Sequence, residues 1–392
     1  MFPKVPFIGR EKEVKYIHDL AYRPNSYVLG IKGEGGIGKT SLLEYANRVL
    51  RKDVGLKALR IIDFDSNEFQ IDDVSNFLIA ISNNFSKESF KEFSLELSDY
   101  QLESQSYVYD FRGWKEKVSR LKQSFIHDYN AYSSTHRIVI FIDTAEKFRN
   151  LKHISTYLDE FVSNAKNTLF VISGRNERAL VDWFSGLNDI QFEEINLSRF
   201  SIKESREYLH EKEKILKNTF QSNLTEKILT LARGLPILID LSLEWLSEDV
   251  PLPWLQNFKI SQFDLLVYEK KKQMEILFEK QLVAPVAKMR EPLNVLTLLL
   301  SEIYPIDKNW VQVLLNISDR DASKLIEKAE AYVFVKSLSD GRITLHDEMR
   351  RMVTEYVWPE IDNDGSRRRR DSQKIVHYLN HQIEKVDDLL DS

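Results

Sequence analysis

A chain of 392 residues is too long to fold around one core and predicts two to four domains. Its 43% hydrophobic and 29% charged residues are typical of a globular protein, and no apolar run approaches the ~18 residues that span a bilayer. The absence of cysteine excludes disulfides and thiolate metal sites, and a net charge of -5 argues against a surface that coats nucleic acid. Together with an N-terminus that lacks the shape of a signal peptide, these features favour a cytoplasmic protein without a membrane partner.

The first predicted element is a helix through Val14, Ile17 and Leu20, which follows a glycine turn flanked by Ile8 and Arg10. Two interpretations are open. The helix is a capped surface helix, or Ile8 packs against adenine while Arg10 reaches the nucleotide. The second interpretation gains force because a phosphate-binding motif follows closely.

That motif begins after a predicted strand from Tyr27 to Ile31. Gly33, four intervening residues and then Gly38-Lys39-Thr40 fit the P-loop pattern G-x-x-x-x-G-K-[ST]. A helix is predicted from Thr40 to Leu50. The expected nucleotide-binding residues of the loop are Gly33, Glu34, Gly35, Gly36, Ile37, Gly38, Lys39, Thr40 and Ser41.

Each part of the loop has a phosphate-binding reason. Glycines let successive N–H groups from Gly36 to Lys39 turn toward an anion, and the start of the next helix adds the positive end of its dipole. Lys39 supplies a point charge for the β and γ phosphates. The Thr40 hydroxyl is the expected Mg²⁺ ligand, because Mg²⁺ prefers oxygen ligands. The sequence therefore predicts ATP or ADP with Mg²⁺ as cofactors.

The region after the P-loop helix predicts a second strand from Ala58 to Ile62, which ends at Asp63. Helices are predicted from Phe69 to Phe85 and from Tyr107 to Tyr129. The serine-rich segment between them, Ser86 to Ser106, is predicted to be a mobile insertion.

Arg137 to Asp143 is a continuous apolar run closed by a carboxylate, which predicts a strand of a parallel sheet covered on both faces. Asp143 then lies at the strand's carboxyl end, where it would hold Mg²⁺ through water or begin the next helix as an N-cap. Glu146 is the nearest second carboxylate. Many P-loop ATPases carry the water-polarising glutamate directly after the aspartate, so its displacement to position 146 predicts slow hydrolysis.

Two further strands complete the predicted sheet. Thr168 to Ile172 leads to Arg175, which either touches the γ-phosphate or faces solvent, and Ile190 to Leu197 is the last strand. Five strands alternating with helices predict a doubly wound α/β fold, a five-stranded parallel P-loop sheet of the ASCE type flanked by helices, over residues 1–198.

Helices take over after residue 198, which predicts a helical lid domain over residues 199–285. Ser201 opens the first helix with a capping box to Glu204, and later helices run from Leu224 to Leu231 and from Ile237 to Leu246. Pro236 is placed as the first residue of a helix within Gly234-Leu235-Pro236. A long charged helix is predicted from Ser261 to Leu282.

Residues 286–360 predict a winged-helix domain made of three helices, a hairpin with a turn at Asp340-Gly341, and a final helix from His346 to Trp358. The third helix, Asp319 to Ala331, mixes acidic and basic side chains, so it offers no basic face for DNA phosphates. We therefore expect this domain to pack against protein. Residues 361–392 are a C-terminal helical segment, whose basic run Arg367 to Arg370 is more often a solvated face than a nucleic-acid clamp.

Taken together, these motifs resemble the STAND class of P-loop ATPases, which contains the NB-ARC and NACHT switch proteins of immunity and cell death. The motifs follow the family order: Ile8-Gly9-Arg10 with Glu13, Gly33 to Thr40, Asp143, Arg175, Gly234-Leu235-Pro236, and Leu345-His346-Asp347. Leu345 replaces the family's methionine, and Thr144 follows Asp143 where a glutamate is common.

The resemblance implies a signal-transduction switch. In such proteins ADP is clamped between the three domains, Pro236 and His346 contact the nucleotide, and ATP exchange opens the clamp and permits self-association or binding of protein partners. The catalytic set implied is Lys39, Asp143, Glu146 and Arg175, with Thr40 and Asp143 on the metal. With no obvious effector domain before Phe7 and no repeat array after Trp358, the chain resembles the switch core of such proteins.

Two alternatives stay open. One is an origin-recognition-like DNA-binding ATPase, which also joins a P-loop domain, a helical lid and a winged helix, but which predicts an acidic pair at Asp143 and a basic recognition helix. The other is a scaffold that holds nucleotide without hydrolysing it.

Overall fold

The computed structural model describes residues 7–66, 69, 72–104, 111–175, 178–186, 191–303, 305–338 and 341–390. The chain divides into two compact units, with the boundary between Ser198 and Arg199. No helix in the described ranges combines the length and apolar character needed to cross a membrane.

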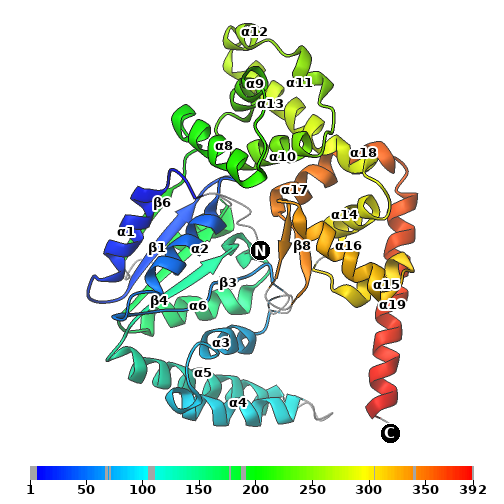
Figure 1. Ribbon diagram of the computed structural model, residues 1–392. Coiled ribbons are helices and arrows are strands. Elements are labelled where there is room, and N and C mark those ends of the chain that lie inside the picture. Colours follow the sequence, from blue (N-terminus) through cyan, green and yellow to red (C-terminus); the bar gives the residue numbers. More distant parts are fainter. Residues whose placement is uncertain are drawn as a thin grey trace. The chain divides into compact units, whose positions relative to one another are not determined.

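The first unit is built on a parallel sheet (Figure 1). Its described strands are β1 (Tyr27–Lys32), β2 (Leu56–Ala58), β3 (Ile62–Asp63), β4 (Arg137–Asp143), β5 (Thr168–Gly174) and β6 (Gln191–Asn196). The order across the sheet is β2, β4, β5, β1, β6, and β3 pairs with β4 beyond the end of β2. All of these pairings are parallel, so the carboxyl ends of the strands share one edge.

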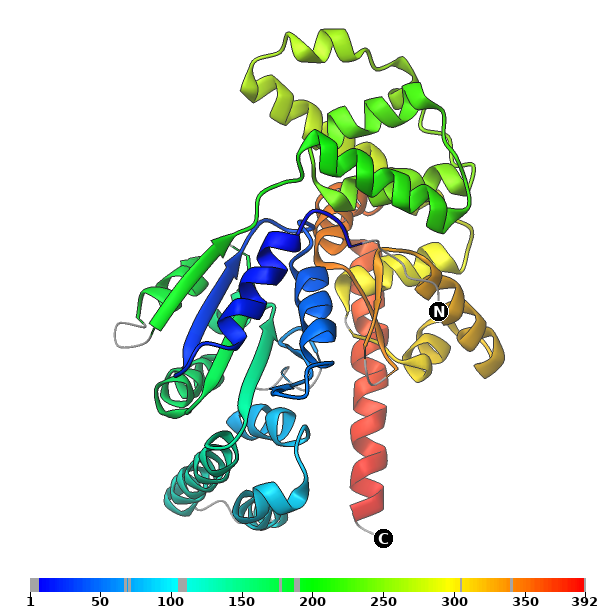
Figure 2. The same cartoon turned by 60° about the vertical axis from the view of Figure 1, so that its left-hand side comes forward.

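Helices cover both faces of this sheet because its central strands are apolar on both sides. The described helices of the first unit are α1 (Glu11–Ala21), α2 (Lys39–Leu50), α3 (Val74–Ser82), α4 (Lys91–Ser104), α5 (Phe111–Ser133), α6 (Lys152–Asn164) and α7 (Arg178–Ser185), with 3-10 turns η2 (Lys87–Phe90) and η3 (Ala145–Arg149). In Figure 2, α1 and α2 lie together on one face. On the other face, Val28, Ile140 and Phe170 pack with α3, α5 and α6 in one core.

The predicted second strand is split into β2 and β3. Side chains capture the backbone groups between them: Asn47 Nδ2 donates to the carbonyl of Leu59 at 2.5 Å, and the Arg60 N–H donates to Asn84 Oδ1 at 2.8 Å. Groups engaged in this way cannot continue a strand ladder. Six described strands therefore occupy the five sheet positions that the sequence predicts.

The prediction of a mobile serine-rich insertion is wrong for the described residues from Ser86 to Ser104, which form η2 and α4. Phe90, Phe93 and Tyr100 are buried there, and the rings of the first two pack at an angle against Phe125 of α5. The many serines in this segment suggested a loop, although its aromatic residues anchor a helix. The predicted helix from Phe69 is also shorter: Asp73 accepts the Ser75 N–H at 2.8 Å and so begins α3 at Val74.

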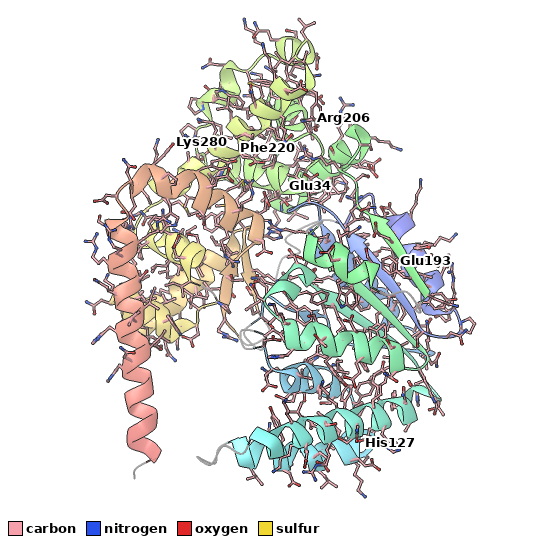
Figure 3. The ribbon with its side chains drawn as sticks, turned by 180° about the vertical axis from the view of Figure 1, so that it is seen from behind. Glu34, His127, Glu193, Arg206, Phe220 and Lys280 are labelled. Carbon is pink, nitrogen blue, oxygen red and sulfur yellow. The ribbon has the colours of Figure 1, made fainter. Side chains whose placement is uncertain are left out.

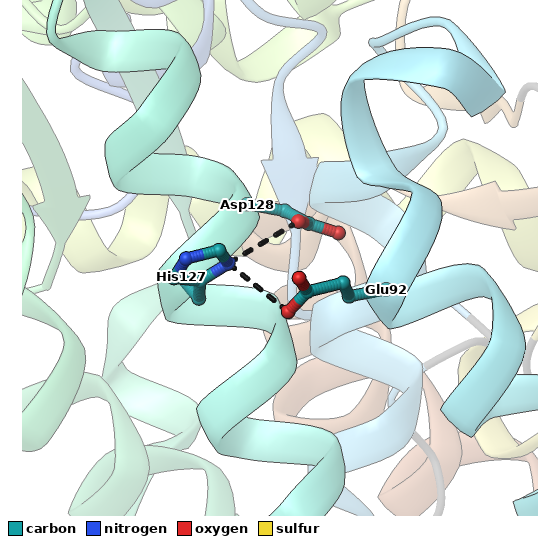
Figure 4. A group of neighbouring side chains, drawn as sticks. All are labelled: Glu92, His127 and Asp128. Atoms are coloured by element: carbon teal, nitrogen blue, oxygen red, sulfur yellow. Dashed lines mark ion pairs between the residues drawn. The ribbon is translucent and has the colours of Figure 1, made fainter.

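Polar contacts add to this helix pair. Asp128 of α5 accepts the Phe93 N–H at 2.9 Å, and His127 lies between Glu92 and Asp128, with its Nδ1 atom 3.1 Å from Glu92 Oε2 (Figure 4). The His127 side chain is 65% exposed, so this ion pair contributes little to stability. The Asp128 bond is the stronger link, because it satisfies a buried backbone donor.

The second unit is mainly helical. Its described helices are α8 (Ile202–Leu216), α9 (Ser222–Ala232), α10 (Pro236–Ser247), α11 (Pro253–Asn257), α12 (Ile260–Asp264), α13 (Tyr268–Val283), α14 (Leu293–Glu302), α15 (Lys308–Leu315), α16 (Asp319–Ala331), α17 (Asp347–Met352), α18 (Trp358–Ile361) and α19 (Ser366–Leu390), with a 3-10 turn η4 (Ala284–Lys288) and a π-helical turn η5 (Val353–Val357). The described strands β7 (Val335–Ser337) and β8 (Ile343–Leu345) form an antiparallel hairpin.

Two predictions within this unit can be compared with the structure directly. The capping box of Ser201 and Glu204 is present, with bonds of 3.2 and 2.7 Å. The single helix predicted from Ser261 to Leu282 is wrong. The Leu266 N–H closes a turn on the carbonyl of Phe263, and an extended Val267 then separates α12 from α13.

Candidate nucleotide site

The P-loop leaves β1 after Lys32 and enters α2 at Lys39. Gly36 and Gly38 have φ values of 70° and 96°, a left-handed conformation that glycine adopts without strain. A Cβ atom on Gly33 would lie 3.0 Å from Ile37 Cγ2 and 3.3 Å from Leu197 Cβ. These glycines keep the backbone tight, so the loop fits a phosphate held by N–H groups at a helix N-terminus.

Lys39 folds back over the loop. Its Nζ atom donates to the carbonyls of Gly33 at 2.9 Å and Glu34 at 3.0 Å. The side chain of Glu34 is exposed, and Figure 3 labels it on this loop. Lys39 is thus held at the rim of the loop, within reach of an anion that the loop would bind.

Arg10 is buried, with 5% of its surface exposed. Its Nη2 atom donates to the carbonyl of Ser198 at 2.7 Å and to that of Ile37 at 3.4 Å, and Nη1 lies 3.5 Å from Glu13. These bonds join the P-loop to the end of β6. Ile8 is half-buried, and neither residue's contact with a nucleotide is tested, so that role stays a prediction.

Asp143 ends β4 at the carboxyl edge of the sheet and is 3% exposed. Its Oδ2 atom accepts from the Thr40 hydroxyl at 2.6 Å, while Oδ1 accepts from the Thr144 N–H at 2.9 Å and from the Ser173 hydroxyl. Three segments far apart in the sequence therefore meet at this carboxylate. Sequence reasoning missed Ser173, although its place directly after a buried strand gave a usable signal.

This arrangement fits Mg²⁺. Mg²⁺ prefers oxygen ligands and usually keeps several of its waters. Thr40 Oγ1 donates to Asp143 Oδ2 at 2.6 Å beside the P-loop. The Thr40 hydroxyl would hold the ion directly, and the Asp143 carboxylate would hold one of its waters.

Glu146 and Arg175 contact each other. Glu146 Oε2 accepts the Arg175 N–H at 2.9 Å, and Oε1 lies 3.4 Å from Arg175 Nε. The carboxylate comes from η3, directly after β4, and the arginine follows β5. A Cβ on Gly174 would lie 2.9 Å from Glu146 Oε2, so the absence of a side chain there permits the contact. Both interpretations of Arg175 in the sequence, on a γ-phosphate or in solvent, omitted this ion pair.

Asp63 is a further carboxylate at the same edge, and sequence reasoning assigned it no role. It lies beside Asp143 in the register of β3 and β4. Its Oδ1 atom accepts from the Thr144 hydroxyl at 2.8 Å. The signal was available, because Asp63 also closes a predicted strand.

The remaining predicted site residues, Pro236 and His346, belong to the second unit. Pro236 is buried at the first position of α10. His346 is the N-cap residue of α17, and its N–H donates to the carbonyl of Phe334 at 2.8 Å. Asp347 is the first helical residue and pairs with Arg350 at 3.2 Å. Contact of Pro236 or His346 with nucleotide stays a prediction.

Among solved structures, the chain is similar to the Walker-type ATPase PABY2304 of Pyrococcus abyssi, with 14% identity, 89% of this chain and 96% of the other covered, and a TM-score of 0.46. It is also similar to Aeropyrum pernix ORC1 in complex with DNA, with 12% identity, coverage of 91% and 95%, and a TM-score of 0.39. For Cdc6p of Pyrobaculum aerophilum the identity is 13%, the coverage 91% and 96%, and the TM-score 0.41.

No curated protein matches the sequence. The profile of the KAP family P-loop domain matches residues 11–280, which is more than half of the chain and includes the P-loop and Asp143. The resemblance to the STAND class is not shown by this match. The chain belongs to the KAP family of P-loop NTPases.

Proposed function

We propose that this protein is an ATP- and ADP-binding switch that hydrolyses ATP slowly. The observation that carries the proposal is the meeting of Thr40, Asp143 and Ser173 at the mouth of a P-loop. Such a group has no evident purpose in a purely structural loop, since it places the buried hydroxyl of Ser173 and the half-buried hydroxyl of Thr40 on one buried carboxylate.

The residues of the site have separate roles. N–H groups from Gly36 to Lys39 bind phosphate oxygens, and Lys39 adds a positive charge. Thr40 and Asp143 hold Mg²⁺, which neutralises charge on the phosphates when it is bound. Ser173 donates to Asp143 and so fixes the orientation of its carboxylate.

The pair of Glu146 and Arg175 supplies a means to distinguish ATP from ADP. A γ-phosphate competes with Glu146 for the guanidinium, whereas ADP leaves the ion pair intact. A ligand shifts an equilibrium only through its differential affinity for the two states. Arg175 provides such a difference, because only ATP offers it a second anion.

The STAND resemblance extends this proposal to the whole chain. The second unit contains α14, α15, α16, the β7–β8 hairpin and α17 in the order that a winged helix has, which supports that interpretation. Gly234-Leu235-Pro236 and Leu345-His346-Asp347 precede α10 and α17 as the resemblance implies. We propose that ADP favours a closed form of the chain. Exchange of ADP for ATP would favour self-association.

DNA binding is not favoured. Asp319 of α16 pairs with Lys308 at 2.8 Å, and the first turn of the helix is acidic. In the basic run, Arg368 lies over the Trp358 ring at 5.2 Å and 3.8 Å from both Glu302 and Asp362. These side chains are engaged with the protein, and neither helix presents an uninterrupted basic face.

The nucleotide that co-purifies with the protein tests the proposal. Release by acid, followed by ion-exchange chromatography, is expected to show ADP in near-stoichiometric amount. Isothermal titration with ATP and ADP, with and without Mg²⁺, then measures both affinities. Absence of binding to either nucleotide would contradict the switch, and binding that is insensitive to Mg²⁺ would contradict the roles of Thr40 and Asp143.

A further inference from the structure

Asp63 lies at the same sheet edge as Asp143 but has no role in the proposed function. β3 pairs in parallel with β4, with Asp63 opposite Asp143. Neighbouring strands lie about 4.8 Å apart, so the two aspartates end adjacent strands at the same level of the sheet edge. The P-loop follows β1 at this same edge, two strands beyond β4.

Thr144 fixes Asp63 relative to the metal-binding group. Thr144 has a left-handed backbone, with φ 59° and ψ 37°. Its N–H donates to Asp143 Oδ1 at 2.9 Å, and its hydroxyl donates to Asp63 Oδ1 at 2.8 Å. A non-glycine residue with positive φ is uncommon, and the two bonds explain why it is maintained here. A continuous chain of contacts therefore runs from Asp63 through Thr144 and Asp143 to Thr40.

Asp63 is also held in place by a residue that follows it closely in the chain. The Asp65 N–H donates to Asp63 Oδ1 at 3.0 Å, and Asp65 itself pairs with Lys147 at 3.0 Å. Asp63 remains half-buried, whereas Asp143 and Asp65 are buried. Its carboxylate is thus held in place but is more accessible than its neighbours.

Glu146 is less suited to act on water. Both of its oxygens face Arg175, which supplies an N–H and the guanidinium. A general base must lie within hydrogen-bond reach of the proton it takes, directly or through one water. A γ-phosphate that takes the guanidinium still leaves Glu146 Oε2 bonded to the Arg175 N–H. Asp63 is instead linked through Thr144 to Asp143, one of the expected metal ligands.

We propose that Asp63 is the general base for ATP hydrolysis. The attacking water forms a bond from its oxygen to the γ-phosphorus, and the bond from that phosphorus to the β–γ bridging oxygen breaks, with its electron pair leaving on ADP. Asp63 takes the proton of the attacking water and returns it to solvent after phosphate departs. This inference rests on the proposed function, because it requires ATP in the P-loop.

The test uses Asp63→Asn in the full chain. An asparagine oxygen still accepts from Thr144 and from the Asp65 N–H, so the local contacts persist while the basic group is lost. Single-turnover hydrolysis, with protein in excess over γ-labelled ATP, detects slow rates. We expect a fall of about 100-fold or more, since general-base catalysis contributes 10²–10⁴-fold. ATP and ADP affinities are expected to stay within about twofold, because the Mg²⁺-holding groups are unchanged.

Asp53→Asn is the matched control. Asp53 accepts the Gly55 N–H at 2.8 Å just before β2, at the opposite edge of the sheet. It undergoes the same chemical change away from the proposed chemistry, and its hydrolysis rate is expected to match that of the wild type.

Formate distinguishes a base from a structural residue. Asp63→Ala leaves room for a small carboxylate, and added formate is expected to restore part of the rate in this variant and none in Lys39→Ala. Three results would overturn the proposal: Asp63→Asn that hydrolyses within threefold of the wild type, a loss in Asp63→Ala that formate leaves unchanged, or a wild type that binds ATP without hydrolysing it. Failure of the wild type to bind nucleotide at all would instead overturn the proposed function.

Discussion

At the scale of single residues, Asp143 shows how one carboxylate organises a site. It is buried, yet both of its oxygens accept hydrogen bonds, from Thr40, Thr144 and Ser173. Thr40 belongs to α2, Thr144 follows β4, and Ser173 belongs to β5. An unpaired buried carboxylate would cost several kcal/mol, so these donors both stabilise the aspartate and fix where a cation would be held.

Lys39→Ala is expected to weaken ADP and ATP binding by at least about thirtyfold, because a charge-assisted bond to phosphate contributes ~2–3 kcal/mol. Thermal unfolding without nucleotide is expected to change little, since Lys39 is half-buried and donates to carbonyls of its own loop, not to the core of the unit. Lys52→Ala, an exposed lysine just after α2, is the control. Titration calorimetry measures the affinities, and wild-type affinity in Lys39→Ala would contradict the phosphate role.

Glu146→Gln is expected to raise the affinity for ATP relative to ADP by about fivefold. The glutamine still accepts the Arg175 N–H but no longer holds the guanidinium by charge, and a partly buried ion pair contributes ~1 kcal/mol. Arg175→Ala is expected to remove the preference altogether. Competition between labelled ADP and ATP measures the ratio, and equal ratios in all three proteins would show that Arg175 does not sense the γ-phosphate.

At the scale of elements, the sequence predicted the parallel strands and the P-loop helix well, because apolar runs ending in glycine or aspartate mark them. It failed where side chains capture backbone groups. Bonds from Asn47 and Asn84 interrupt the predicted second strand. Asp73 caps α3, so the helix begins later in the chain than predicted. The bonds of Asn47 and Asn84 join residues 12 and 24 positions apart, a separation that strand and helix periodicity does not reveal.

The candidate site shows the same limit. Glycine, lysine and threonine spacing predicts the loop itself. The bonds of Thr144 to Asp63 and of Glu146 to Arg175 join strands whose adjacency becomes known only with the sheet order. Two predicted strands visibly end in carboxylates, Asp63 and Asp143, but the pairing of these strands was not visible.

A pH-dependent contact within the second unit gives an element-scale prediction. Burial raises the pKa of Glu244, on α10, to about 8, and its two oxygens accept the Val333 N–H at 2.9 and 3.2 Å. A carboxyl group with a raised pKa in the folded state binds a proton more tightly there than in the unfolded chain. Its contribution to stability is therefore present at low pH and is lost as the pH rises from about 4.5 to about 8, by up to ~1.4 kcal/mol per pH unit.

Glu244→Gln is expected to remove this dependence while keeping an acceptor for Val333. Denaturant unfolding at pH 5, 6.5 and 8 should show a smaller fall in the free energy of unfolding for the variant than for the wild type. Glu207→Gln, at an exposed position on α8, serves as control. Parallel curves for wild type and Glu244→Gln would show that Glu244 titrates normally.

At the scale of the whole molecule, the proposed switch requires that ATP and ADP favour different forms of the chain. We expect analytical ultracentrifugation with ADP to show one sedimenting species, and ATP with Mg²⁺ to shift it toward larger assemblies. Small-angle scattering on the same samples checks the change in dimensions. Lys39→Ala is expected to show no response to either nucleotide, and identical profiles for the wild type in ADP and ATP would contradict a switch.

The glycine at position 174 has a consequence for how this protein can diverge. A side chain there would meet Leu180 at 2.6 Å and the backbone nitrogen of Glu146 at 3.1 Å, so the η3 turn would have to move before any other residue could be accepted. That movement would carry Glu146 away from Arg175. Residues 146, 174 and 175 should therefore be inherited as a set: homologues with a larger residue at 174 are expected to have lost the acidic side chain at 146, and a comparison of orthologous sequences can count how often the three change together.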